Sequence, residues 1–146
     1  MSAALASKYD TYDNVDRTSY TSASVSPTAN APLYVVIINY GTSTVPTVSA
    51  TGYTFTQRQT VANGTRVITL FSAAGISSPG SITVTASFGT STQTGCEITI
   101  LEGSGIDATT NDGIVQSATA TGSATSGSVT LTVTSGNLTV LSVSHA

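Results

Sequence analysis

The chain has 146 residues and a mass of 14.6 kDa, which is the size of one domain with a single core. Only 8% of its residues are charged, against about 25% in ordinary soluble domains. With four Lys or Arg residues against seven Asp or Glu residues, the chain lacks the basic patch that nucleic-acid binding requires, and no apolar run reaches the about 18 residues of a membrane span.

The first 17 residues differ in composition from the rest of the chain. They hold Lys8, Asp10, Asp13, Asp16 and Arg17, and they show no alternation of polar and apolar residues. We therefore divide the chain into an N-terminal arm, residues 1–17, and a β-sandwich domain, residues 18–146. Because this N-terminus lacks the apolar stretch of a secretory signal, we expect the protein to be made and to mature in the cytoplasm.

From residue 18 onward, small polar residues alternate with β-branched or aliphatic ones, which is the period of a strand. The predicted strands are 18–26, 33–40, 44–50, 53–61, 65–72, 81–88, 94–102, 114–121, 128–134 and 138–144. Residues 33–40, LYVVIINY, are apolar at both parities, which predicts a central strand covered on both faces. Asn63 and Gly64 separate two alternating runs and predict a tight hairpin turn with both residues at positive φ.

Short strands at spacings of about ten residues predict an all-β fold, a two-sheet antiparallel β-sandwich. We expect a jelly-roll-like arrangement, with an immunoglobulin-like sandwich as the second choice and an extended N-terminal arm. The alternation leaves two choices of inner face for some strands. The inner residues are predicted to be Val35 and Ile37 or Val36 and Ile38, Val67 and Thr69 or Ile68 and Leu70, then Ile82, Val84, Ile98, Ile100, Val129, Leu131, Val133, Leu138 and Val140.

Residues that carry catalytic chemistry are few and far apart. The only histidine, His145, is one residue from the C-terminus, so Cys96 has no histidine nearby in the sequence and is expected to be a small buried residue. Glu97 and Glu102 lie five residues apart on one predicted strand and therefore point to opposite faces, which argues against a catalytic carboxylate pair. We expect a solvated Glu97, a Glu102 associated with a turn, no catalytic residue and no enzymatic activity.

One loop, GSGIDATTNDG at residues 103–113, gathers oxygen ligands. Asp107, Asn111 and Asp112 are residue types that bind Ca²⁺. Their spacing differs from that of an EF-hand, and the same residue types are common in turns. We predict no metal and no cofactor, and a weak Ca²⁺ site between Asp107 and Asp112 stays open.

The order of several segments resembles a β-sandwich module found in tailed-phage virion proteins and in some bacterial surface proteins. The segments are YTSASVSPTANAPLYVVIINYG, VPTVSATGYTFTQRQ, RVITLFSAAGISSPGSITVTAS, GCEITILEGSGID and GSVTLTVTSGNLTVLSVS, which together span about 18–144. The motifs are the P-G-x-I-T-V-T hairpin and the corner from Glu102 to Asp107, where this chain has small residues in place of the usual aromatic one. A single module that follows an arm is similar to the capsid decoration proteins of tailed bacteriophages.

This resemblance implies a viral structural protein that is made in the host cytoplasm and resides on the capsid surface of the virion. It implies a homotrimer that binds the major capsid protein, clamps neighbouring coat subunits and stabilises the head. No nucleic acid, membrane or small-molecule substrate is expected as a partner. A protein of this kind reaches the outside through lysis and needs no export signal.

We expect the arm to contact a neighbouring subunit. Tyr9 and Tyr12 are predicted to anchor that interface, because tyrosine buries ring area while its hydroxyl stays solvated. Asp13, Asp16 and Arg17 are predicted to set the register through charged pairs at the rim. The alternative function is a cell-surface or phage-fibre adhesin or a carbohydrate-binding module, which the Thr-rich faces and the loop from Asp107 to Gly113 favour.

Overall fold

The structure, a computed structural model, describes residues 3–106, 113–114 and 117–121 and the single residues 128, 130 and 132. All regular structure in this part of the chain is β-strand, and it contains no helix of the length and apolarity that a membrane span requires. The strands are β1 (Ala4–Asp13), β2 (Ser19–Thr21), β3 (Leu33–Tyr40), β4 (Thr47–Ser49), β5 (Thr56–Asn63), β6 (Arg66–Ala73), β7 (Thr85–Ser87) and β8 (Gly95–Ser104).

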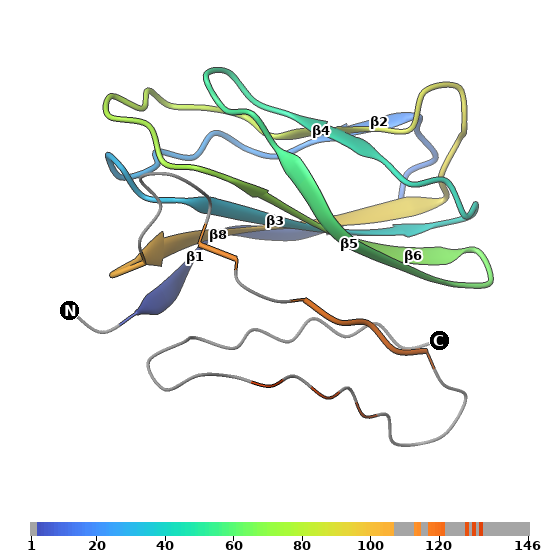
Figure 1. Ribbon diagram of the computed structural model, residues 1–146. Coiled ribbons are helices and arrows are strands. Elements are labelled where there is room, and N and C mark those ends of the chain that lie inside the picture. Colours follow the sequence, from blue (N-terminus) through green and yellow to red (C-terminus); the bar gives the residue numbers. More distant parts are fainter. Residues whose placement is uncertain are drawn as a thin grey trace.

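These strands form two sheets, so the predicted two-sheet antiparallel sandwich is confirmed. The large sheet has the order β1-β8-β3-β6-β5, and the small sheet has the order β2-β7-β4. Every neighbouring pair is antiparallel. Figure 1 shows the small sheet stacked over one face of the large one. We call that face of the large sheet the inner face and the opposite one the outer face.

The core lies between the two sheets and is centred on β3. Leu33, Val35 and Ile37 of this strand are fully buried, and burial of each such side chain contributes about 1.5–3 kcal/mol. Across the ladders, Val35 pairs with Phe71 of β6 and with Ile100 of β8. Of the two inner faces that the alternation allowed, the structure therefore uses the one with Val35 and Ile37. The other members of the core are Tyr20, Val25, Tyr53, Phe71, Ala73, Ile82, Val84, Ala86, Phe88, Cys96, Ile98 and Ile100.

The outer face of the large sheet is covered in part as well. Tyr34, Val36 and Ile38 alternate with the core residues along β3, yet they are only 5–7% exposed. The prediction of a central strand covered on both faces is therefore confirmed. Residues 117–121 lie against this outer face, where the Gln59 side-chain amide donates to the Ser117 carbonyl at 3.5 Å (Figure 1).

In the sequence analysis, residues 1–17 are assigned to an arm and no strand is named there. Residues 4–13 form β1, which pairs with β8 from Ala4 opposite Ser104 to Asp13 opposite Cys96. A bulge at Lys8 shifts the register, so that Leu5 lies on the outer face and Tyr9 on the inner face opposite Ile100. This change of face removes the continuous alternation by which a strand is recognised in a sequence.

Other predicted elements differ in extent. The predicted strands 18–26 and 81–88 contribute three-residue ladders plus a single bridge between Val25 and Ile82. Residues 117–121 were predicted to be part of a strand, but the structure assigns no strand to them. The predicted strand 138–144 lies outside the described residues, and so do most residues of 128–134.

The predicted hairpin is present, but its turn is displaced by one residue. Asn63 pairs with Arg66 as the last residue of β5, so the two turn residues are Gly64 and Thr65. Gly64 has φ +61°, and the described non-glycine residues include only Asn30 at positive φ. The turn therefore needs positive φ only at its first central position, which glycine supplies.

Candidate functional site

Three loops meet at the end of the sandwich where β1 and β3 finish and β8 begins. Residues 14–18 follow β1, residues 41–46 follow β3, and residues 88–94 precede β8. We call this region the loop end. The large apolar side chains that are exposed in the described part of the chain all belong to it. They are Tyr12, Val15 and Val45, with exposed fractions of 54%, 49% and 38%.

One fully buried amide, Gln93, connects the three loops. Its Oε1 accepts from Asn39 Nδ2 at 3.0 Å and from the Thr42 backbone N–H at 3.2 Å, and its Nε2 donates to Thr42 Oγ1 at 2.6 Å. Its backbone forms a two-way bridge with Arg17 at 2.8 and 3.1 Å. Because a buried amide is stable only when its donors and acceptors are paired, Gln93 fixes the relative position of the loops.

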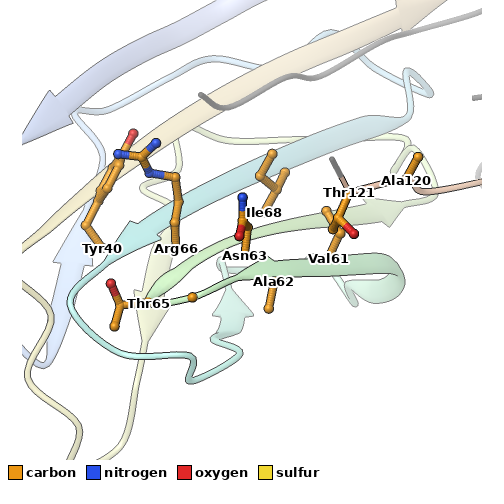
Figure 2. A pocket seen from close by; sticks show the side chains of 10 residues that line it. Tyr40, Val61, Ala62, Asn63, Thr65, Arg66, Ile68, Ala120 and Thr121 are labelled. Carbon is orange, nitrogen blue, oxygen red and sulfur yellow. The ribbon is translucent and has the colours of Figure 1, made fainter. Parts of the chain in front are cut away.

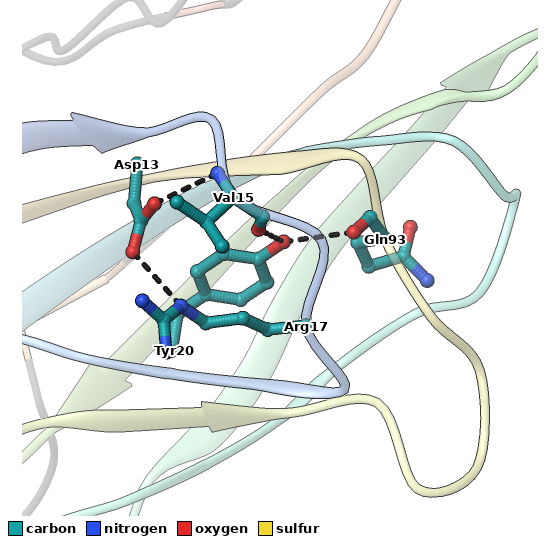
Figure 3. Close-up of polar contacts among 5 residues, drawn as sticks. All are labelled: Asp13, Val15, Arg17, Tyr20 and Gln93. Atoms are coloured by element: carbon teal, nitrogen blue, oxygen red, sulfur yellow. Dashed lines mark hydrogen bonds and ion pairs between the residues drawn. The ribbon is translucent and has the colours of Figure 1, made fainter.

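The loop 14–18 is further held by the side chains shown in Figure 3. The Tyr20 hydroxyl shares its one proton between the Val15 carbonyl at 2.8 Å and the Gln93 carbonyl at 2.9 Å. Asp13 accepts from the Val15 backbone N–H at 2.9 Å and from Arg17 Nε at 3.2 Å. Burial raises the pKa of Tyr20, so its hydroxyl remains a donor at neutral pH. The exposed Val15 side chain is therefore displayed on a fixed backbone.

The predicted interface residues are placed in different environments. Tyr12 is exposed at the loop end, and Asp16 is exposed in the loop 14–18. Tyr9 is half-buried against the core. Asp13 and Arg17 form an ion pair with each other, a surface pair worth about 0–1 kcal/mol.

Tyr12 also begins a row of side chains across the outer face. Its ring meets that of Tyr40 edge-on, with centroids 5.6 Å apart. Gly95 makes room for this contact, because a Cβ there would lie 2.7 Å from the Tyr12 hydroxyl. On the other side of the row, the Arg66 guanidinium carbon lies 4.7 Å from the Tyr40 ring centroid. The row runs on this face from β1, over Gly95 of β8, to β3 and β6.

Three of the candidate catalytic groups, Cys96, Glu97 and Glu102, lie in the part of the chain that the structure describes. Cys96 is buried as predicted, and burial, with smaller effects of Asp13 and Glu97, raises its pKa to about 12. Glu97 and Glu102 point to opposite faces of β8, as predicted. Glu97 is half-buried, and burial together with the nearby Asp10 raises its pKa.

Glu102 lies near the opposite end of the sandwich and holds three elements together. It accepts from the Thr28 backbone N–H at 2.6 Å and from Thr28 Oγ1 at 2.8 Å, and it pairs with Lys8 Nζ at 3.1 Å. Burial alone would raise the pKa of Glu102, but the Thr28 hydrogen bonds and the Lys8 ammonium outweigh it and lower the pKa below 4.5. Although the sequence predicted a turn-associated residue, Glu102 lies within β8 and binds a neighbouring loop.

This lowered pKa predicts an acid-sensitive contribution to stability. A carboxyl group with a lower pKa in the folded chain stabilises it above about pH 4.5, and the contribution is lost as the pH falls through the folded value. We expect Glu102→Gln to lose about 1–3 kcal/mol at pH 7 and correspondingly less at pH 3, as measured by urea unfolding. Glu97→Gln is the matched control. Because the pKa of Glu97 is raised in the folded chain, removing its charge should change the free energy of unfolding more favourably at pH 7 than at pH 3.

Within the described residues, no three His, Cys, Asp or Glu side chains are close enough to hold a metal ion. The residues of the open Ca²⁺ prediction, 107–112, lie outside that part, as does His145. The sequence analysis did not single out Gln93 or Arg66. A polar residue in the loop before a strand carries no periodic signal of burial, and an arginine two residues after Asn-Gly is typical of a solvated hairpin.

No protein-family model matches the chain, and no curated protein or solved structure is significantly similar to it.

Proposed function

We propose that this chain is a capsid decoration protein, a viral structural protein that attaches through its loop end to the outer surface of a phage head. The observation that carries the proposal is the exposure of Tyr12 near the end of β1 and of Val15 and Val45 on loops that Gln93 holds in place. Exposed apolar side chains on a rigid backbone lose little conformational entropy when a partner covers them. Such a surface supports binding to a protein rather than chemistry.

Stabilisation of the head follows from preferential binding. A cap that binds the assembled lattice and not the free coat subunits stabilises the lattice by RT ln(1 + [L]/Kd), about 2.7 kcal/mol for each site when the cap is present at 100 times its Kd. The predicted homotrimer would multiply this effect, because each trimer would contact several coat subunits. The low charge of the body leaves few groups to desolvate when these contacts form.

Cosedimentation with empty shells tests this proposal. The shells would be assembled from the major coat protein of the genome that encodes this chain, which the proposal requires to be a phage genome. We expect the wild-type chain to saturate a fixed number of sites and Val15→Asp/Val45→Asp to bind at least about tenfold more weakly, because two charges would be buried at the interface.

Ser78→Asp/Thr83→Asp is the matched control, because it adds the same charge at exposed positions outside the three loops. The free energy of unfolding of each double variant should differ from that of the wild type by no more than about 0.5 kcal/mol per substitution. Equal binding by the two double variants would show that the loop end is not part of the interface. Failure of the wild type to sediment with the shells would overturn the decoration function.

The alternative function, an adhesin or carbohydrate-binding module, is favoured by a cavity on the outer face beside Arg66. A glycan array, read with and without Ca²⁺, separates the two functions. An adhesin would bind specific glycans and ignore the shells.

A further inference from the structure

A cavity of about 340 Å³ opens on the outer face beside the β5–β6 hairpin. Figure 2 shows Tyr40, Arg66, Asn63 and Ile68 projecting to the same side of the sheet, with Thr121 standing near Val61. The residues that line the cavity are Tyr40, Val61, Ala62, Asn63, Gly64, Thr65, Arg66, Ile68, Ala120 and Thr121. A volume of this size is at the lower end of the range for small-ligand sites, about 300–1,000 Å³.

Arg66 brings an unmatched charge to this cavity. Its Nε is buried and has no hydrogen-bond partner among the described residues. The ion pairs in that part of the chain are Lys8 with Glu102 and Arg17 with Asp13, so no carboxylate there lies within 4.0 Å of Arg66. Tyr40 provides a cation–π contact, which positions the guanidinium but does not neutralise it. A partly buried guanidinium without a carboxylate partner is unfavourable, and an anion in the cavity would pair with its positive charge.

The other lining residues define the kind of anion. A single guanidinium matches a carboxylate in charge and in its two-pronged geometry. Asn63 and Thr65 add a neutral amide and a hydroxyl, groups that hydrogen bond with ligand hydroxyls. Val61 and Ile68 supply an apolar surface. Arg66 is the one charged side chain among the residues that line the cavity, which matches a monoanion better than a dianion such as phosphate.

We propose that this cavity binds a small hydroxylated carboxylate, the chemistry of an acidic sugar such as a uronic or sialic acid. Arg66 pairs with the carboxylate, Tyr40 holds the guanidinium in position, and Asn63 and Thr65 hydrogen bond to hydroxyl groups. The site binds a ligand and performs no chemistry on it. Tyr40 touches Tyr12 of the loop end, but binding of a small ligand in this cavity requires no capsid, so the proposal stands whether or not the chain attaches to one.

Titration of the isotopically labelled full chain by NMR tests the proposal. The probes are N-acetylneuraminic acid, glucuronic acid, galactose, acetate and inorganic phosphate at constant ionic strength. We expect both acidic sugars to shift the backbone amides of residues 61–68, with a Kd of about 1 mM. Acetate and galactose should each bind at least about tenfold more weakly, because each has only part of the recognised chemistry.

Arg66→Gln should weaken binding of the acidic sugars about 10- to 100-fold, the loss expected for a hydrogen bond to a charged group. Arg58→Gln is the matched control, because Arg58 lies on β5 and donates to Ser72 at 2.7 Å.

Four results would each overturn the proposal. The first is that neither acidic sugar shifts the amides, and the second is that Arg66→Gln binds the acidic sugars as tightly as the wild type. The third is that acetate or galactose binds as tightly as the acidic sugars, and the fourth is that phosphate binds more tightly than they do. An unchanged amide spectrum away from residues 61–68 shows that Arg66→Gln is folded, so a loss of binding is then a property of the site. Because no capsid shell is present, failure here leaves the decoration function unaffected.

Discussion

Gly75→Ala is expected to destabilise this chain by about 3 kcal/mol or more. A Cβ at position 75 would lie 2.2 Å from the carbonyl carbon of Asn30 and 2.5 Å from its oxygen. These are backbone atoms, so no rotation of a side chain can relieve the overlap. The same backbone is fixed by the Asn30 N–H, which donates to the Ile76 carbonyl at 2.8 Å, and Asn30 is already at φ 60°.

The cost should reach or exceed the upper end of the range for overpacking, about 3 kcal/mol, which is a large part of the about 5–15 kcal/mol that stabilises an ordinary domain. Gly80→Ala is the matched control, because nothing lies within 4 Å of a Cβ at that position. It should leave the urea midpoint unchanged or raise it by the equivalent of up to about 1 kcal/mol. Equal midpoints for the two variants would show that the turn at Asn30 moves freely away from Gly75.

The fold was predictable where one face of a strand is buried along its whole length. Residues 33–40 were assigned with the bounds that the structure gives, because their apolar residues at both parities fit a central strand. β1 was missed for the opposite reason. It is an edge strand with few buried side chains, its charged residues protect an open edge, and the Lys8 bulge changes the face of its side chains partway along.

The candidate site was less predictable than the fold. Tyr12 was singled out for its residue type, and the structure exposes it at the loop end. Val15 and Val45 were not, because an exposed valine in a loop has no sequence signature. Gln93 is 54 residues from Asn39 in sequence, and only the pairing of β3 with β8 brings the two amides together. Such contacts depend on strand order, which the alternation of residues does not specify.

Gln93→Ala is expected to destabilise the chain by about 3 kcal/mol and to loosen the loop end. The substitution leaves the Thr42 backbone N–H without its side-chain acceptor and removes one of the three acceptors of the Asn39 amide. Each unpaired buried group costs about 1–3 kcal/mol, and the missing side chain leaves a cavity as well. The backbone bridge between Gln93 and Arg17 does not need the side chain, so the loop 14–18 should be disturbed less than the loop 41–46.

Urea unfolding and amide hydrogen exchange measure the two effects separately. Gln57→Ala is the matched control, since Gln57 is exposed on β5 and its loss should stay within about 0.5 kcal/mol. In Gln93→Ala, exchange should accelerate at Thr42 and Thr44 more than at the core amides of β3. If the loop end is the interface, this variant should lose stability and shell binding together, whereas Val15→Asp/Val45→Asp should lose binding alone. Retention of full shell binding by a Gln93→Ala chain with loosened loops would show that the partner does not require a rigid loop end.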